Sequence, residues 1–216
     1  SNKQQLTSLS SYTLSPCWTP DGSKIVFYSN KDSTWGDIWV INADGSNPTR
    51  LTFTNGHAGK HGIDISPNGE KIVYRHQPSG TNWGYTYEIY TADIDCTGDA
   101  STVTIGSETK IASFDNNIDI APVFSPDGNR IVWASGRNNP YGECATNCYF
   151  TTLELFQIDI DGTDETQLTF NTVTMDRDPT FSPDGTTVVF SSDRAIGSAH
   201  HPAQWDRWKI DADGRN

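Results

Sequence analysis

The sequence is poor in positive charge and has no long apolar runs. It contains 15 Lys and Arg residues against 27 Asp and Glu residues, a net charge of −12, and its basic residues form no cluster. Binding to the phosphates of nucleic acids or anionic membranes needs such clusters, so the composition argues against both partners. A run of about 18 apolar residues does not occur, so we expect no membrane insertion. Only 19% of residues are charged, too few for a coiled coil.

Motifs of several enzyme classes are also missing. The sequence has no G-x-S-x-G nucleophile elbow, no phosphate-binding loop and no dinucleotide fingerprint. Three glutamates, Glu143, Glu154 and Glu165, are interpreted as surface groups rather than catalytic acids. The only methionine, Met175, is internal and the chain starts at Ser1, so we expect a trimmed N-terminus. These absences favour a protein that is not an enzyme.

Cysteine is scarce, with four residues in the chain. Cys144 and Cys148 lie in the stretch GECATNC, where their spacing favours a short-range disulfide. A metal site would need two further ligands nearby, and none is evident. A disulfide is typical of an oxidising compartment, so we expect an extracellular or periplasmic protein. The pairing of Cys17 and Cys96 stays open.

Aromatic residues, in contrast, are abundant. Seven Trp, eight Tyr and nine Phe make up 11% of the chain, far more than a disordered acidic chain carries. Hydrophobic residues reach only 34%, which is low for a helical globule. The composition therefore indicates an all-β domain.

A four-residue motif recurs four times and predicts the architecture. It reads TPDG at 19–22, SPNG at 66–69, and SPDG at 125–128 and 182–185. Pro, Asp and Gly together favour a tight turn, because Pro fixes φ, Asp accepts backbone hydrogen bonds and Gly tolerates positive φ. Each motif is soon followed by a β-rich run: KIVFYS, KIVYRH, RIVWAS or TVVFSS. The runs on either side of each turn are expected to form an antiparallel hairpin.

Each unit continues with a third strand and most with a short fourth strand. The third strands are DIWVINADG, YEIYTADIDCTG, LFQIDIDG and RWKIDADG, and the fourth strands are TRLT, TKIA and TQLT. The turn positions Asp21, Asn68, Asp127 and Asp184 are 47, 59 and 57 residues apart. Four antiparallel strands repeated at such intervals predict the blades of a β-propeller.

In this repeat pattern the sequence resembles the TolB-like, WD-related β-propeller family with its SPDG repeat. The shared pattern is P-x-W/F-S/T-P-D-G-x-x-I/V-x-F-x-S, then D-I-W-x-x-x-A-D-G, then R-L-T, and it covers essentially the whole chain. The resemblance implies an all-β propeller of four four-stranded antiparallel blades. Such blades occur in periplasmic scaffolds, peptidase accessory domains, polysaccharide lyases and adhesive surface proteins, so the resemblance alone does not select a function.

A single propeller domain is expected to span residues 1–216. The predicted blades cover about 12–52, 60–113, 117–169, and 175–216 plus 3–7. The N-terminal KQQLT resembles a fourth strand, so we expect it to complete the last blade and close the ring. TolB-like propellers usually have six or seven blades, so two alternatives stay open: a piece of a larger ring, and a head-to-tail assembly of copies.

One end of the predicted propeller carries the candidate binding residues. The loops between the second and third strands are long and varied, whereas the Pro-Asp-Gly turns at the other end are short and uniform. Inserted loops that display aromatic residues are typical of binding sites. The predicted ligand-binding face comprises Trp35, Trp83, Tyr85, Tyr141, Tyr149, Gln204 and Trp205.

Histidines on the same end suggest a metal-dependent alternative. His57 and His61 fall in the loop that enters the second inner strand, and His200 and His201 fall in the long loop of the fourth unit. Imidazoles from different blades could bind a transition metal. Some propeller-shaped oligogalacturonate lyases use a His-rich metal site, so a carbohydrate-active enzyme of that kind is the alternative function. The competing interpretation is that these are solvated loop histidines.

Polar residues at the start of the inner strands form a second candidate site. We expect Lys60, Asp119, Asp176 and Arg177 to line an axial channel, where carboxylates bind water, a cation or a basic tail. Asp119 and Asp176, or the Asp-rich turns after the third strands, could help to hold Ca²⁺. No loop has the spacing of a known calcium motif, and turn aspartates usually cap their own turns.

The sequence as a whole predicts a non-catalytic secreted or periplasmic binding or assembly module. Its partner would be a protein or a glycan at the aromatic-rich loop face. The alternatives are the metal-dependent enzyme described above and a surface protein that assembles by exchanging its N-terminal strand between copies.

Overall fold

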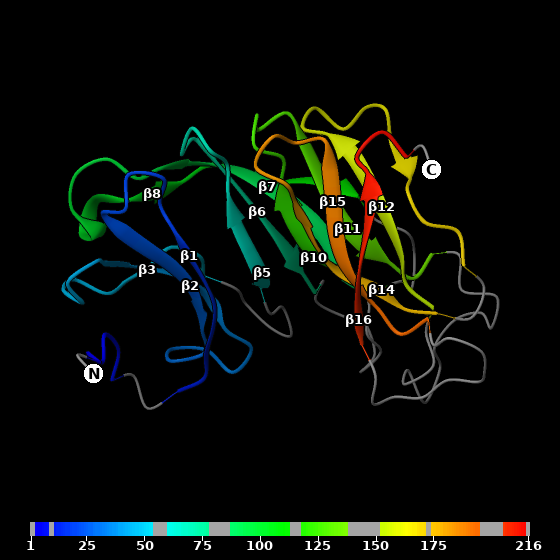
Figure 1. Ribbon diagram of the computed structural model, residues 1–216. Helices are drawn as coiled ribbons and strands as arrows, with labels where there is room; N and C mark the ends of the chain where they lie inside the picture. The colour runs from blue at the N-terminus through cyan, green and yellow to red at the C-terminus, as the bar shows by residue number, and fades with distance from the viewer. Residues whose placement is uncertain are drawn as a thin grey trace.

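The computed structural model describes residues 3–8, 11–53, 60–77, 87–112, 118–137, 152–171, 174–194 and 205–214. In these ranges the chain forms four antiparallel sheets in a row, which are the blades of a propeller (Figure 1). The all-β, four-bladed architecture predicted from the repeat is confirmed. No helix in the described residues is long and apolar enough to cross a membrane.

Blades 1 and 3 each have four strands in sequential order. Blade 1 consists of β1 (Thr13–Trp18), β2 (Lys24–Ser29), β3 (Asp37–Asn42) and β4 (Thr49–Arg50). Blade 3 consists of β10 (Asp119–Phe124), β11 (Arg130–Ser135), β12 (Glu154–Asp159) and β13 (Thr166–Gln167).

Blades 2 and 4 depart from this plan. Blade 2 consists of β5 (Lys60–Ile65), β6 (Lys71–His76), β7 (Glu88–Asp95), β8 (Thr104–Ile105) and β9 (Thr109–Ala112), with the short 3₁₀ helix η1 (Ala100–Thr102) before β8. Both β8 and β9 pair with β7. Blade 4 consists of β14 (Asp176–Phe181), β15 (Thr187–Ser192) and β16 (Asp206–Asp211).

The same tight turn joins the first two strands of every blade. The glycine N–H donates to the carbonyl three residues earlier, at 2.8 to 2.9 Å, in Gly22→Thr19, Gly69→Ser66, Gly128→Ser125 and Gly185→Ser182. The side chain of the turn Asp, or of Asn in blade 2, accepts the backbone N–H two residues later, as Asp127 does from Asn129 at 3.1 Å. Each glycine has a φ between 68° and 76°, which is why the motif ends in glycine.

Every inner strand also contains a bulge at the same place. Ser15, Gly62, Ala121 and Asp178 all have φ between 52° and 58°, and the register shifts around each of them. In three blades the next residue is a proline, which has no N–H to leave unpaired at a bulge. The repeat shows the proline in the sequence, but it does not show the left-handed residue before it.

The core lies between successive blades. One apolar cluster joins blades 1 and 2, a second joins blades 2 and 3, and a third joins blades 3 and 4. The inner strands contact one another in chain order, β1 with β5, β5 with β10, and β10 with β14. In the described part of the chain no comparable contact joins β14 to β1, and blades 1 and 4 lie at opposite ends of the row (Figure 1).

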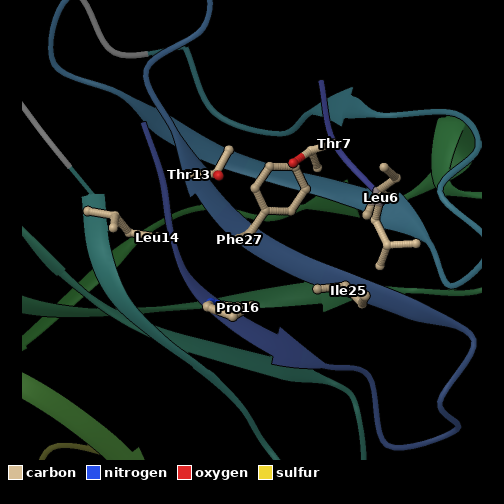
Figure 2. A pocket seen from close by; sticks show the side chains of 8 residues that line it. Leu6, Thr7, Thr13, Leu14, Pro16, Ile25 and Phe27 are labelled. Carbon is tan, nitrogen blue, oxygen red and sulfur yellow. The ribbon is translucent and has the colours of Figure 1, made fainter. Parts of the chain in front are cut away.

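Residues 3–8, called the N-terminal segment below, do not complete blade 4 in this structure, which corrects the predicted ring closure. They form no strand and lie on the outward face of blade 1, defined by Ile25, Phe27, Trp39 and Ile41. Figure 2 shows Leu6 and Thr7 beside Phe27 at a pocket on this face. Among the described residues no other blade packs on this apolar face, so Leu6 removes apolar surface from water by packing there.

Candidate functional site

The blades have two ends with different chemistry. At the turn end, the three Pro-Asp-Gly turns and the Pro-Asn-Gly turn of blade 2 share one geometry. At the loop end, where the inner strands begin and the second strands lead into the third, the residues differ between blades. Of the predicted site residues, the structure describes Trp35, Lys60, His61, Asp119, Asp176, Arg177 and Trp205. The others lie outside the described residues: His57, Trp83, Tyr85, Tyr141, Cys144, Cys148, Tyr149, His200, His201 and Gln204.

A stack of rings occupies the loop end between blades 1 and 2. The rings of Tyr28 on β2 and His61 on β5 are 4.0 Å apart and nearly parallel. The Tyr28 hydroxyl donates to the carbonyl of Trp35 at 3.0 Å, so this stack is connected to the loop before β3. Burial, and then the charge of Arg75, lower the pKa of His61 to about 4, so its imidazole is neutral at pH 7. Arg75 in turn lies over the ring of Tyr87 at 4.6 Å.

A second cation–aromatic pair lies at the loop end of blade 4. The guanidinium of Arg177 on β14 is 3.9 Å from the ring centre of Trp205, just before β16. Arg177 also forms an ion pair of 3.4 Å with Asp178, and both side chains are well exposed. Two of the predicted residues, Arg177 and Trp205, therefore do come together.

Asp119 and Asp176 accept hydrogen bonds mainly from their own blades; Asp176 also accepts from Asn171, between blades 3 and 4, at 3.0 Å. Both are fully buried. Asp119 accepts from the indole N–H of Trp133 at 3.1 Å, and Asp176 accepts from the Ser192 hydroxyl and from Arg194, each at 2.6 Å. These partners lie on or just after the second strand of each blade. Both carboxylates thus take part in hydrogen bonds that brace the loop end, and the channel lining predicted from the sequence stays a prediction.

Lys60 occupies the corresponding position in blade 2 with the opposite charge. Its side chain is 4% exposed, forms an ion pair with Glu108 and lies 5.2 Å over the ring of Tyr74. Burial alone would raise the pKa of Glu108, but the hydrogen bond and charge of Lys60 outweigh it and hold that pKa below its ordinary value. Lys60 is therefore already paired inside the blade.

Sequence reasoning missed one feature, which we call the acid–threonine latch. In blade 1, the Thr52 hydroxyl donates to Asp37 at 2.9 Å and accepts the N–H of Ile38 at 3.0 Å. In blade 3, Thr169 donates to Glu154 at 2.6 Å and accepts the N–H of Leu155 at 2.9 Å. The latch joins the start of the third strand to the residues just after the fourth. Its sequence signal is an acidic residue at the start of the third strand, followed later by Leu-Thr.

Glu154 is the acidic member of the latch in blade 3, so its interpretation as a surface group was wrong: only 2% of it is exposed. Burial raises the pKa of its carboxyl to about 7 from an ordinary value of 4.5. The carboxyl therefore binds a proton more tightly in the folded state, and the protein loses stability as the pH rises through this window.

We expect Glu154→Gln to stabilise the protein above pH 7 relative to wild type. Glutamine mimics the protonated acid and does not ionise, so the advantage of the variant should grow by on the order of 2 kcal/mol from ~pH 5 to ~pH 8. Urea unfolding across this pH range measures the difference. The exposed Glu70 gives the matched control: Glu70→Gln should show a nearly constant difference. A pH-independent effect of Glu154→Gln would contradict the assigned cause.

The turn aspartates and the described cysteines act locally. Asp44 accepts the N–H of Ser46 at 2.8 Å and Asp161 that of Thr163 at 2.9 Å, so both cap their own turns. No group of three or more His, Cys, Asp or Glu side chains that could hold a metal ion occurs within the described ranges. Cys17 and Cys96 are free thiols, and Cys17 donates to Asp64 at 3.5 Å.

Four repeated sheets in chain order, joined face to face through apolar clusters, define a β-propeller. Comparison with solved structures makes this more specific. The chain is similar to a TolB structure from Agrobacterium tumefaciens, with a TM-score of 0.67, 23% identity, and coverage of 92% of this chain and 61% of the other. The chain is also similar to TolB from Acinetobacter baumannii, with a TM-score of 0.64 and 20% identity, over 94% of this chain and 42% of the other. By fold, this chain is a TolB-like β-propeller.

The same fold occurs in proteins with other activities. An oligogalacturonate lyase from Vibrio parahaemolyticus matches with a TM-score of 0.66 and 17% identity, over 98% of this chain and 53% of the lyase. No protein-family model matches the chain. The chain thus spans between 42% and 61% of the length of these three proteins. At these identities the similarity establishes the fold, and function has to be argued from the site.

Proposed function

We propose that this chain is a non-catalytic β-propeller binding module that engages a protein or a glycan through its loop end. The observation that carries the proposal is the contrast between the two ends. The turn end repeats one hydrogen-bonded turn in all four blades. The loop end instead presents different ring and cation pairs, Tyr28 with His61 and Arg177 with Trp205. Varied side chains on a rigid scaffold are typical of binding surfaces.

The Arg177–Trp205 pair is the part of this end best suited to a ligand. An indole ring offers a flat apolar face to a sugar ring or an apolar side chain, and the adjacent guanidinium donates to carboxylates or hydroxyls. An extracellular or periplasmic location would fit the disulfide predicted between Cys144 and Cys148. Mass spectrometry of the unreduced protein tests that disulfide directly.

The test compares two tryptophans at opposite ends of the blades, the half-buried Trp205 and the exposed Trp18. Wild type, Trp205→Ala and Trp18→Ala are screened against a glycan array that includes oligogalacturonates and against an immobilised peptide library. Trp18 ends β1 at the turn end and is 56% exposed, so its variant is the matched control. We expect Trp205→Ala to weaken a specific ligand at least tenfold, about 1.4 kcal/mol, and Trp18→Ala to leave it unchanged. Equal losses in both variants, or full binding by Trp205→Ala, would refute the assignment to the loop end.

The similarity to an oligogalacturonate lyase supports one alternative function. In that case His57, His61, His200 and His201 would hold a transition metal at the loop end. The neutral imidazole of His61 suits a metal ligand, although in the structure its ring stacks on Tyr28. Elemental analysis of the purified protein and an assay for unsaturated uronate products distinguish the two functions. Detection of a bound metal, together with loss of product formation in His200→Ala and His201→Ala, would favour the lyase function over the binding module.

A further inference from the structure

Among the described residues, blade 4 has three strands and no outer strand. In blades 1 and 3, the outer strand pairs with the middle of the third strand: Arg50 with Trp39, and Gln167 with Phe156. The corresponding residue of blade 4 is Trp208 on β16, and among the described residues β16 pairs with β15 alone. Trp208 is 37% exposed, whereas Trp39 and Phe156 are 3% and 4% exposed. An unpaired edge of this kind is a template for another strand.

The N-terminal segment has the sequence and the local conformation of such an outer strand. Its residues Gln5-Leu6-Thr7 match Arg50-Leu51-Thr52 and Gln167-Leu168-Thr169. In all three stretches the first side chain donates to the carbonyl of the threonine two residues later. The distances are 2.7 Å for Gln5→Thr7, 2.7 Å for Gln167→Thr169 and 2.9 Å for Arg50→Thr52. The segment is therefore already shaped as an outer strand, although no sheet pairs with it here.

Blade 4 also presents half of an acid–threonine latch. Asp206 begins the third strand of blade 4, at the position of Asp37 in blade 1 and Glu154 in blade 3. Those two carboxylates are 0% and 2% exposed beneath their threonines, whereas Asp206 is exposed. Thr7 is the matching threonine of the N-terminal segment. If the segment paired with β16, Thr7 could donate to Asp206 and accept the N–H of Arg207.

The segment and the vacant edge lie at opposite ends of the same molecule (Figure 1). Leu6 packs on the outward face of blade 1, beside Ile25 and Phe27 (Figure 2). This contact is with apolar side chains, and the segment takes no part in a β-ladder. A second copy can reach the vacant edge without any rearrangement of the four blades.

We propose that residues 3–7 of one copy pair with β16 of a second copy and complete its blade 4. The spacing of the chain supports this arrangement. Six residues lead from Thr7 to the start of β1 at Thr13, close to the eight from Thr52 to Lys60 and the seven from Thr169 to Asp176. Blade 1 of the donor would then follow blade 4 of the acceptor as the next blade does within one chain.

The two outward faces that would meet are compatible. That of blade 1 is apolar, with Ile25, Phe27, Trp39 and Ile41. That of blade 4 carries Val189 with Arg207 and Lys209. In the proposed assembly their long stems would cover apolar surface of blade 1, and their charges would lie over its aromatic rings. Contacts of this kind between head and tail form a closed ring or a longer array of copies.

Disulfide trapping tests the pairing directly. By the register of β4 on β3, Gln4 should lie opposite Lys209, with Cα atoms about 4.5 to 5.5 Å apart, which is within the Cα–Cα range of a disulfide. Gln4→Cys combined with Lys209→Cys should therefore give a covalent dimer or larger covalent species under mild oxidation. Each single variant, and Gln4→Cys combined with Lys71→Cys on blade 2, controls for random and native-cysteine cross-links. A disulfide formed within one chain would overturn the exchange between copies, and so would equal cross-linking in the controls.

Light scattering on the full chain tests the same proposal without cross-links. Wild type should be a dimer or larger at high concentration. Leu6→Asp should weaken self-association at least tenfold, because it places a charge in the apolar position of the strand. Thr7→Val should weaken association, and Thr7→Ser should restore it, because only serine keeps the hydroxyl of the latch. Circular dichroism shows whether each variant keeps the fold. A monomeric wild type, or association indifferent to both positions, would refute the proposal.

Discussion

Trp133→Ala is expected to lower the free energy of unfolding by about 4 kcal/mol. Trp133 is fully buried on β11, in the apolar cluster between blades 2 and 3, with its ring 6.0 Å from that of Phe156. The substitution leaves a cavity in this cluster. It also removes the indole N–H that donates to the buried carboxylate of Asp119, so that group loses a hydrogen bond it needs.

Urea unfolding followed by both fluorescence and circular dichroism measures this loss. Two probes are needed because a row of blades can unfold in steps. Trp208→Ala is the matched control, because Trp208 lies at the end of the row and is 37% exposed. This substitution should lower the free energy of unfolding by only about 1 to 2 kcal/mol. Similar losses for the two tryptophans would show that the interface between blades 2 and 3 is not where the stability resides.

The sequence predicts the blades well because their determinants are local. A Pro-Asp-Gly turn between two alternating runs specifies a hairpin through backbone preferences that act within a few residues. The four hairpins, and the third strand that follows each of them, lie where the repeat placed them. Apolar residues on both faces of a strand, as in Ile131 and Val132, also indicate a sheet packed on both sides.

What the sequence does not predict depends on distant partners or on the ends of the row. Asp119 and Asp176 are polar residues on an inner strand, and a channel lining is the natural expectation. Their orientation depends on cross-strand neighbours, Ser135 and Ser192, and on Trp133 and Arg194. A pattern within one strand does not contain that information.

The place of the N-terminal segment is a second example. Its sequence matches an outer strand, so the prediction of its strand character has a structural basis in the Gln5–Thr7 hydrogen bond. Which sheet it joins is a competition between the edge of blade 4 and the apolar face of blade 1. In a single chain the N-terminal segment packs on the nearby apolar face of blade 1, because it could reach blade 4 only if the two ends of the row met.

Gly36→Ala is expected to lower the free energy of unfolding by about 3 to 4 kcal/mol, although it adds only one methyl group. Gly36 lies just before β3 with a φ of 82°, a conformation that costs alanine about 1 to 2 kcal/mol. A methyl group there would also come within 2.1 to 2.4 Å of the ring and hydroxyl of Tyr28. Only 6% of Tyr28 is exposed, and it packs in the cluster between blades 1 and 2, so its ring has little room to move.

Two variants separate the clash from the backbone strain. Gly22 has a similar φ of 68°, and a methyl group there meets nothing within 4 Å, so Gly22→Ala should cost only about 1 kcal/mol. In a Tyr28→Ala background, Gly36→Ala should likewise cost only its backbone strain, which gives a coupling of about 2 kcal/mol in a double-mutant cycle. Because Tyr28 stacks on His61 and donates to Trp35, Gly36→Ala should also weaken any ligand of the loop end near blade 1. Equal costs for Gly36→Ala with and without Tyr28 would show that the ring yields to the methyl group, and the stack would then not be a rigid part of the site.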